Sequence, residues 1–194
     1  MDRRVVKTKE AIKNAYFALL SESEDGKVTI TDIAKRADID RKTFYLHYES
    51  VEQLMKDFSQ DRISGLYAYL NEKKFFENPY AKTAIFDALS YLVGKDLELY
   101  RELARNENCA FFWLQIEKEL VKVISEVYLR EGMYTKNELE ILGRFFTAGT
   151  INIYKSWLRG EVECSLSDLG ILASEISFRG IVGIIEFGQA RKKG

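Results

Sequence analysis

TITDIAKRADIDRKTFYLHY, residues 29–48, is the stretch that decides how the N-terminal part of the chain folds. It predicts two short helices joined by a tight turn. Thr29 suits the first position before one helix and Asp40 the same position before the other, because short polar side chains accept hydrogen bonds from the free N–H groups there. Asp38 lies in the turn, where a left-handed backbone is expected and Asp is tolerated. Packed on a third helix, this unit forms a helix-turn-helix.

The second short helix, residues 41–47, is expected to turn polar side chains outward. In a DNA major groove, Arg and Lys donate to guanine, and Thr contacts a thymine methyl or a phosphate. Tyr and His suit contacts with DNA phosphates, which fix the register of the protein on the duplex. Threonines at the start of the first helix suit phosphates on the opposite side of the groove. The candidate DNA-binding residues are Thr29, Thr31, Arg41, Lys42, Thr43, Tyr45 and His47. The alternative is a generic helical hairpin with a charged surface.

Helical periodicity continues along the rest of the chain and predicts an all-α protein of about nine helices. One proline in 194 residues fits long helices better than a fold rich in turns. Asp25-Gly26 and Pro79 are the clearest breaks. Beside the two short helices, we expect helices over about 3–21, 50–72, 82–93, 96–105, 111–130, 135–159 and 165–188, the fourth opening with a Ser50–Gln53 capping box.

Composition excludes several classes of protein. A hydrophobic content of 46% is too high for a disordered chain. The first residues are charged and lack the apolar core of a secretory signal, and no stretch approaches the length of a membrane helix, so we expect a cytoplasmic protein without membrane contact. The two cysteines, Cys109 and Cys164, lack metal-ligand spacing. With a single histidine, His47, and no phosphate loop or nucleophile motif, we expect no catalytic residues, metal or cofactor.

The net charge of -1 does not by itself favour nucleic acid, but basic residues are concentrated near the N-terminus. Such a local basic face attracts phosphates even on a neutral protein. An ordinary solvated helix surface is the alternative. The basic residues concerned are Arg3, Arg4, Lys7, Lys9, Lys13, Lys35, Arg36, Arg41 and Lys42.

Residues 5–56 resemble the DNA-binding domain of TetR-type (TetR/AcrR) transcription regulators. The order and spacing match at Ala15-Tyr16, Leu19-Leu20, Thr29-Ile30, Asp32-Ile33-Ala34, Ala37, Thr43-Phe44-Tyr45, His47-Tyr48 and Glu52-x-Leu54. The sequence departs from the family where Asp38 and Lys42 replace frequent glycines and where Val51 replaces a lysine that contacts DNA phosphate. The resemblance implies a three-helix DNA-binding head, residues 1–50, followed by a larger helical effector-binding and dimerisation domain, residues 51–194.

Two long helices near the C-terminus suit a four-helix dimer interface. Glycines inside them cost helix stability unless they allow close approach of a neighbouring helix. The alternative is that these glycines serve only packing within one chain. The residues concerned are Leu139, Leu142, Phe145, Phe146, Gly149, Ile153 and Trp157 in one helix and Leu169, Leu172, Ile176, Gly180, Gly183, Ile184 and Phe187 in the other.

The middle of the chain is rich in aromatic residues, which line many small-molecule pockets. Ordinary core packing is the alternative for each of them. The candidate pocket residues are Phe86, Tyr91, Phe112, Trp113, Tyr128 and Tyr154.

Together these features predict a ligand-responsive, DNA-binding transcription regulator. As a homodimer it would place two reading helices about 34–36 Å apart on a palindromic double-stranded operator. A small-molecule effector that favours another spacing would release the DNA. Repression is the expected outcome. A transcription activator and a protein-binding helical adaptor of the same fold remain as alternatives.

Overall fold

The computed structural model describes residues 3–23, 27–77, 83–130, 132 and 134–191, with side chains up to Arg179. Over these residues the chain forms nine α-helices, one short 3-10 helix and no strand, which confirms the all-α prediction. The predicted breaks at Asp25-Gly26 and Pro79 lie outside the described residues. The elements are α1 (Arg3–Glu22), α2 (Ile30–Arg36), α3 (Arg41–His47), α4 (Val51–Glu72), α5 (Ala84–Gly94), α6 (Leu97–Arg105), η1 (Glu107–Cys109), α7 (Ala110–Leu129), α8 (Lys136–Leu158) and α9 (Leu166–Arg191).

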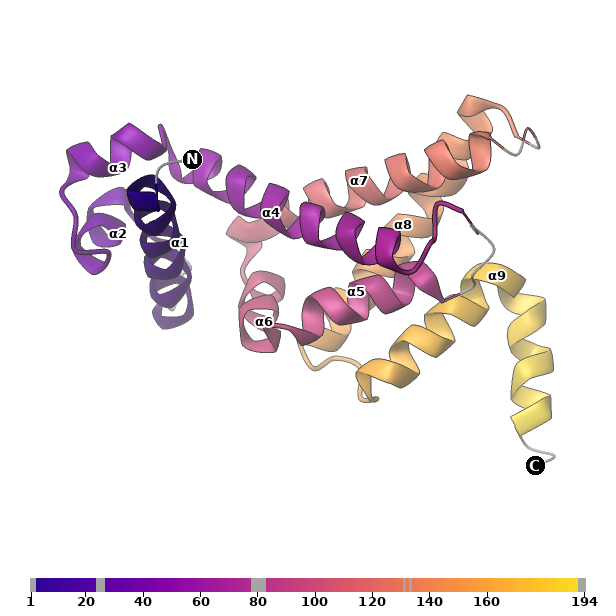
Figure 1. Cartoon of the computed structure of the whole chain (residues 1–194). Helices are drawn as coiled ribbons and strands as arrows, with labels where there is room; N and C mark the ends of the chain where they lie inside the picture. The colour runs from indigo at the N-terminus through magenta and orange to yellow at the C-terminus, as the bar shows by residue number, and fades with distance from the viewer. Residues whose placement is uncertain (1–2, 24–26, 78–82, 131, 133, 192–194) are drawn as a thin grey trace.

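Helices α1–α3 form a small unit at one end of the molecule, here called the head. Figure 1 shows α4 leading away from the head into the larger group of helices α5–α9. Within that group α7 packs along α8, while α4 packs on α5 and α7 and α5 packs on α9. The head and the larger group are therefore joined by the chain running into α4, by ion pairs between α1 and α4, and by a contact between α1 and α6.

The core of the head forms because apolar residues recur at helical spacing. Ile12, Tyr16 and Leu20 follow one another every four residues in α1 and are buried. Ile33 from α2 and Phe44 from α3 are fully buried in the same hydrophobic core. Since residues four apart lie on one side of a helix, α1 provides the surface on which the two short helices pack.

Side chains and backbone hold the turn between α2 and α3 as the sequence predicts. Thr29 Oγ1 accepts from the N–H of Asp32 at 3.2 Å, and Asp40 Oδ1 accepts from the N–H of Thr43 at 2.6 Å. Asp38 has a φ of 54°, in the left-handed region, and the next N–H, that of Ile39, donates to the carbonyl oxygen of Ala34 at 3.0 Å. The backbone thus reverses in the few residues between the helices.

The caps of the longer helices agree with the sequence in part. Ser50 accepts from the N–H of Gln53 at 3.2 Å, but the Gln53 side chain accepts from the N–H of Glu49 and not from that of Ser50. The predicted capping box at α4 is therefore only half formed. A full capping box lies instead at the start of α8, between Thr135 and Glu138.

A close approach of α7 and α8 was not predicted. A Cβ atom added at Gly143 would lie 3.2 Å from Cγ1 of Val121, so this glycine lets the two helices approach. The predicted glycine of α8, Gly149, has no atom within 4 Å of an added Cβ. Intrachain packing therefore explains Gly143 and leaves Gly149 unexplained.

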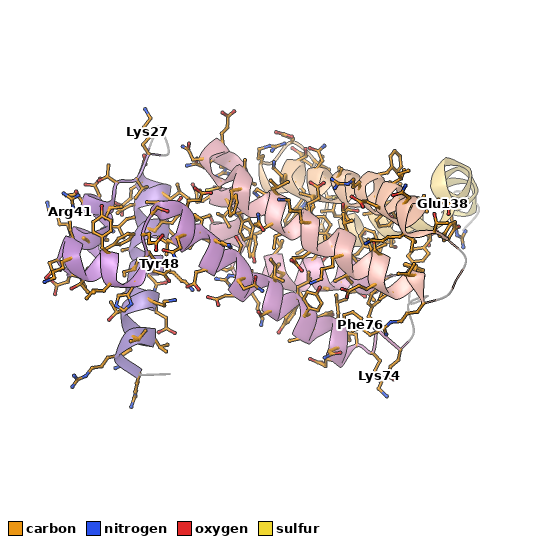
Figure 2. All side chains as sticks on the ribbon, turned by 90° about the horizontal axis from the view of Figure 1, so that it is seen from above. Lys27, Arg41, Tyr48, Lys74, Phe76 and Glu138 are labelled. Carbon is orange, nitrogen blue, oxygen red and sulfur yellow. The ribbon has the colours of Figure 1, made fainter. Side chains whose placement is uncertain are left out.

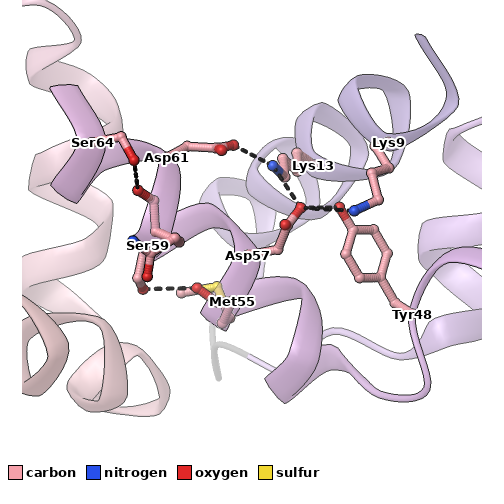
Figure 3. Close-up of polar contacts among 9 residues, drawn as sticks. Lys9, Lys13, Tyr48, Met55, Asp57, Ser59, Asp61 and Ser64 are labelled. Carbon is pink, nitrogen blue, oxygen red and sulfur yellow. Dashed lines mark hydrogen bonds and ion pairs between the residues drawn. The ribbon is translucent and has the colours of Figure 1, made fainter. Parts of the chain in front are cut away.

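A polar network fixes α4 to the head (Figure 3). The Tyr48 hydroxyl donates to Asp57 Oδ2 at 2.6 Å, and Lys13 Nζ lies 2.9 Å from the same oxygen. Lys13 also pairs with Asp61, one turn further along α4. Lys9 Nζ lies 3.5 Å from Asp57 and 5.1 Å from the centre of the Tyr48 ring. Residues from α1, from the end of α3 and from α4 thus share one carboxylate.

The network favours the charged forms of Asp57 and Lys13 and the neutral form of Tyr48. Burial is the largest single influence on Asp57 and raises its pKa, but hydrogen bonds from Tyr48 and Lys13 together outweigh it and leave the pKa below its ordinary value. Burial likewise opposes charge on Lys13, yet the two carboxylates raise its pKa overall. Burial and the neighbouring Asp57 raise the pKa of Tyr48, so its hydroxyl remains a donor.

Replacing Asp38 with valine should lower the free energy of unfolding by about 1–2 kcal/mol, because a β-branched side chain is strained at positive φ. Asp38→Gly is the matched control and should stay within about 0.5 kcal/mol of the wild type. Urea unfolding followed by circular dichroism measures both. Equal stability of the valine variant and the wild type would contradict the strained turn.

Replacing Asp57 with asparagine should lower the free energy of unfolding at pH 7 by about 1–2 kcal/mol, since the acceptor loses its charge at a site partly open to solvent. Because the folded-state pKa of Asp57 is lowered, its contribution is complete above the ordinary value of 3.8 and is lost as the pH falls through the folded-state value. The difference between the wild type and D57N should therefore shrink between pH 5 and pH 3.

Urea midpoints at several pH values measure this difference. Asp87→Asn, which changes an exposed acid on α5, is the control and should show no such narrowing. A D57N variant as stable as the wild type at pH 7 would show that the network does not hold α4 to the head.

Candidate functional site

Helix α3 presents one face to the core and the other to solvent. Phe44 is fully buried and Tyr48, the residue after the helix, is 1% exposed. Arg41 and Lys42, at the start of the helix, are exposed, and Tyr45 is 47% exposed. Figure 2 shows Arg41 at the outer end of the head, far from Lys74 and Glu138 at the opposite end of the molecule. The outer face of α3 thus offers cations and a phenol at one end of the structure.

The remaining candidate residues surround this face. Thr29 and Thr31 are exposed at the start of α2, while Thr43 and His47 are half-buried on α3. The N–H of Thr43 lowers the pKa of Asp40, so the capping carboxylate stays ionised and keeps the first turn of α3 in place. All seven predicted residues lie on the two short helices or at their first caps, on one small unit.

Leu46 was missed as a candidate, although it is 75% exposed on α3. It lies two positions from the buried Phe44, which places it about 200° around the helix. That spacing was available in the sequence and predicts an outward side chain. An exposed leucine between polar neighbours suits apolar contact with a thymine methyl group in a major groove.

The basic residues near the N-terminus divide into two groups. Lys9 and Lys13 pair with carboxylates of α4, and Arg36 pairs with Glu22 of α1. Lys9 and Lys13 thus join α1 to α4, and Arg36 forms an exposed ion pair within the head. The other exposed members of the predicted set are Arg3, Arg4, Lys7, Lys35, Arg41 and Lys42.

The six predicted pocket residues do not come together in one cavity. Phe112 and Trp113 are buried in the core, where Trp113 Nε1 donates to the carbonyl oxygen of Leu103 at 2.8 Å. Tyr91 is 43% exposed and its ring lies 4.5 Å from that of Tyr69. The predicted pocket residues are therefore divided between the core and the surface.

Tyr154 serves the packing of α8 on α5. Its hydroxyl donates to the carbonyl oxygen of Phe86 at 3.1 Å and lies 2.9 Å from Ser90 Oγ. Burial raises the pKa of Tyr154 to about 12, so the hydroxyl stays protonated. Of the six residues, Phe86 and Tyr128 share one apolar cavity.

That cavity has a volume of about 260 Å³ and lies among the end of α4, α5, α7, α8 and α9, at the end of the molecule away from the head. Among the described residues that line it, none carries a charged side chain. The polar groups are the hydroxyls of two tyrosines and one serine. The lining residues are Phe75, Ile85, Phe86, Ile124, Tyr128, Tyr134, Leu139, Leu142, Phe146, Ser177 and Phe178.

A larger hollow of about 560 Å³ lies between α1, α4 and α6. Charged residues of both signs line it, including Lys13, Asp61 and Arg62. Small-molecule sites are mostly apolar with few polar groups, so the smaller cavity fits that description better.

Large apolar side chains are exposed on α8 and on the first part of α9. Phe145 is 84% exposed and Ile141 is 68% exposed, while Ile176 of α9 is 52% exposed. Of the residues predicted for a dimer interface, Leu142, Leu172 and Ile176 are exposed with Phe145, whereas Leu139 and Leu169 are buried within the chain. The predicted residues from Gly180 onward lie beyond the described side chains.

Within the part of the chain that the structure describes, none of the helices combines the length and the apolar character needed to cross a lipid bilayer.

The chain was compared with known protein families, sequences and structures. No family model matches the chain. An uncharacterized HTH-type transcriptional regulator of Bacillus subtilis, YxbF, is 35% identical over 97 residues, which cover 46% of this chain and 26% of that protein. The chain thus spans about a quarter of the length of this relative.

Solved structures resemble the chain over nearly its whole length. FadR of Thermus thermophilus, described as a TetR family transcriptional repressor in complex with lauroyl-CoA, has a TM-score of 0.62 at 19% identity, covering 89% of this chain and 94% of that one. The dihydroxyacetone kinase operon activator DhaS has a TM-score of 0.59 at 19% identity, covering 90% and 96%. A TetR-like regulator from Rhodococcus sp. RHA1 has a TM-score of 0.59 at 17% identity, covering 91% and 96%.

These neighbours are transcriptional regulators, and their helices match both the head and the larger helical group of this chain. The resemblance seen in residues 5–56 and the architecture of all nine described helices agree. The chain therefore has the all-helical fold of the TetR family of transcriptional regulators.

Proposed function

We propose that this protein is a ligand-responsive, DNA-binding transcription regulator of the TetR family, which represses from a palindromic operator as a homodimer. The observation that carries the proposal is the outer face of α3, where Arg41, Lys42 and Tyr45 are exposed together while Phe44 holds the helix on the head. Residues 1–50 then form the DNA-binding domain and residues 51–194 the effector-binding and dimerisation domain. No catalytic role is assigned to any residue.

The α3 face supports two kinds of contact with a duplex. Lys42 and Arg41 at the start of α3 suit guanine acceptors in the major groove, and Leu46 suits a thymine methyl group. Thr29, Thr31 and Tyr45 suit the phosphates on either side, which fix register without reading sequence. Since several of these contacts involve charge, operator affinity should fall steeply with salt.

The apolar face of α8 and α9 supports a homodimer. Exposed phenylalanine, isoleucine and leucine side chains gather there, and Gly149 leaves open space beside them for close approach of another helix. A second copy that brings the same face forms a four-helix interface around a twofold axis. The two heads then read two half-sites of an inverted repeat.

The repressor reading is supported by the description of the Thermus thermophilus FadR structure, a repressor bound to lauroyl-CoA. An activator, DhaS, has the same fold, so the fold alone is compatible with both signs of regulation. In either case a ligand that binds one arrangement of the heads better shifts the population towards it.

Selection of bound duplexes from a randomised DNA pool should enrich an inverted repeat. On that duplex Lys42→Ala and Tyr45→Ala should each lower affinity by about 1–3 kcal/mol, roughly 5- to 150-fold, in a fluorescence anisotropy titration at fixed salt. Leu46→Ala should reduce the preference for thymine at one position per half-site. Failure to enrich any sequence at low salt would leave a protein-binding adaptor as the better function.

Lys118→Ala is the matched control, because Lys118 is exposed on α7, outside the head. It removes the same charge as Lys42→Ala and should leave operator affinity within about twofold. An equal loss in both variants would mean that general charge, and not the α3 face, governs binding.

Replacing Phe145 with glutamate should convert the homodimer to a monomer, because a charge buried in an apolar interface costs several kcal/mol. Sedimentation velocity over a range of concentrations measures the change. Leu114→Glu is the control, since Leu114 is also an exposed apolar residue, at 45%, but lies on α7. A wild-type protein that sediments as a monomer at every concentration would refute the dimer.

A further inference from the structure

The hollow of about 560 Å³ between α1, α4 and α6 is distinct from the apolar cavity. Part of its wall is apolar, because Phe58 is buried there and Phe17 and Leu99 are half-buried. Carboxylates that are mostly exposed surround this apolar part. The volume lies within the range of small-molecule sites, about 300–1,000 Å³. The charges that make the hollow unsuited to a hydrocarbon suit a small charged molecule.

Most of the charged groups in the wall are paired with other groups of the protein. Lys13 pairs with Asp57 and Asp61, Glu98 with Arg101 and Glu102 with Arg105. Arg62, Asp96 and Glu10 differ, because none of them forms an ion pair with a described residue. The wall therefore contains one cation and two carboxylates that lack a partner of opposite charge.

Arg62 lies at the apolar part of the wall, where it packs on Phe58. Its guanidinium carbon is 4.7 Å from the centre of the Phe58 ring. The side chain is half-buried, and its Nε atom is buried without a hydrogen-bond partner among the described residues. Burying a donor of a charged group without an acceptor costs free energy, so packing alone does not explain this position.

The hydroxyl of Tyr100, on α6, is a second buried donor without a partner. Tyr100 is 0% exposed, and its oxygen has no hydrogen-bond partner in the described part of the chain. Burial raises the pKa of Tyr100, while the charge of Arg62 lowers it and that of Asp96 raises it further. The hydroxyl thus stays protonated, and it lies near the two unpaired charges.

Asp96 immediately precedes α6, at a position where an aspartate commonly caps a helix. Its side chain makes no capping hydrogen bond, unlike that of Asp40 before α3. The carboxylate is exposed. It is therefore available to a cation in the hollow.

We propose that this hollow binds an amino acid in its zwitterionic form, with an apolar side chain. The carboxylate of the amino acid accepts from Arg62 and from the Tyr100 hydroxyl, and its ammonium group lies against Asp96. The apolar side chain packs on Phe17 and Leu99. This site goes beyond the proposed function and does not depend on DNA binding.

The positions of the unpaired groups favour a zwitterion over a simple ion. The two charges of an amino acid are on groups attached to one carbon, and here a cation and a carboxylate both act on one hydroxyl. A simple amine would leave Arg62 and Tyr100 without an acceptor. A simple anion would meet the unpaired carboxylates of Asp96 and Glu10 without a compensating positive charge of its own.

Isothermal titration calorimetry of the full chain tests the ligand class with L-leucine, L-methionine and L-phenylalanine in turn. At least one of them should bind with one molecule per chain and a Kd of about 1 mM or lower. The absence of saturable binding by all three would overturn the proposal.

Analogues that lack one charge test the zwitterion. For phenylalanine these are 2-phenylethylamine, without the carboxylate, and 3-phenylpropanoate, without the amine. Each should bind about tenfold more weakly than the amino acid, or weaker still. Equal affinity of the amine would refute the contact with Arg62, and equal affinity of the acid would refute the contact with Asp96.

Tyr100→Phe removes one oxygen atom and keeps the ring. It should weaken amino-acid binding about tenfold, but the urea midpoint of the protein without ligand should not fall, because this hydroxyl has no partner in the described chain. Tyr154→Phe is the matched control, since the Tyr154 hydroxyl bonds with Ser90 and Phe86. It should lower the urea midpoint and leave affinity within about twofold. The reverse pattern would remove Tyr100 from the site.

Arg62→Met keeps an apolar side chain of similar length against Phe58 and removes the charge. It should weaken binding about tenfold or more. Arg144→Met is the control, because Arg144 is exposed on α8 and paired with Glu140, and it should leave affinity within about twofold. Circular dichroism checks that both variants fold, and Tyr100→Phe tests the site independently. Wild-type affinity in the folded Arg62→Met variant would overturn the proposal.

Discussion

The carboxylate of Asp57 is the point at which three segments of the chain meet. Asp57 belongs to α4. Its carboxylate accepts a hydrogen bond from Tyr48, at the end of α3, and forms an ion pair with Lys13 of α1. Hydrogen bonds to a charged acceptor are stronger than neutral ones, and several of them on one oxygen restrict the angle between the elements that provide them. The position of α3 relative to α4 therefore depends on this network.

The rest of the molecule is arranged around the helix that the network anchors. Helix α3 lies beyond one end of α4 (Figure 1), and Phe75, just past the other end, lines the apolar cavity. Helix α4, 22 residues long and held to α1 by ion pairs near its start, spans the distance between the two.

Apolar side chains are exposed in two places that differ in character. Leu46 is a single apolar residue among polar neighbours on α3, whereas α8 and the first part of α9 expose several, among them Ile141, Phe145 and Ile176. A lone exposed leucine is ordinary on a protein surface, but several large apolar side chains exposed on two neighbouring helices are not. The first fits contact with a base edge, and the second fits association of two copies.

Local physics made much of the fold predictable. The caps Thr29 and Asp40 and the left-handed Asp38 depend on backbone groups only a few residues away, and the buried residues of α1 follow from the helical period. The outward face of α3 follows from the same period, which also contained the overlooked signal for Leu46. Sequence was sufficient here because the interacting atoms are neighbours along the chain.

Tertiary structure alone decided the rest. Lys13 meets Asp61 across 48 residues and Ser90 meets Tyr154 across 64, and no periodicity specifies such pairs. The same limit explains why only two of the six aromatic residues predicted for a pocket, Phe86 and Tyr128, line the apolar cavity. A cavity is bounded by side chains from several helices, and which of them face one another depends on how those helices cross. The sequence by itself determined the helices, the caps of α2 and α3 and the outward face of α3, while packing decided which lysines pair with α4, where the cavity lies and what lines it.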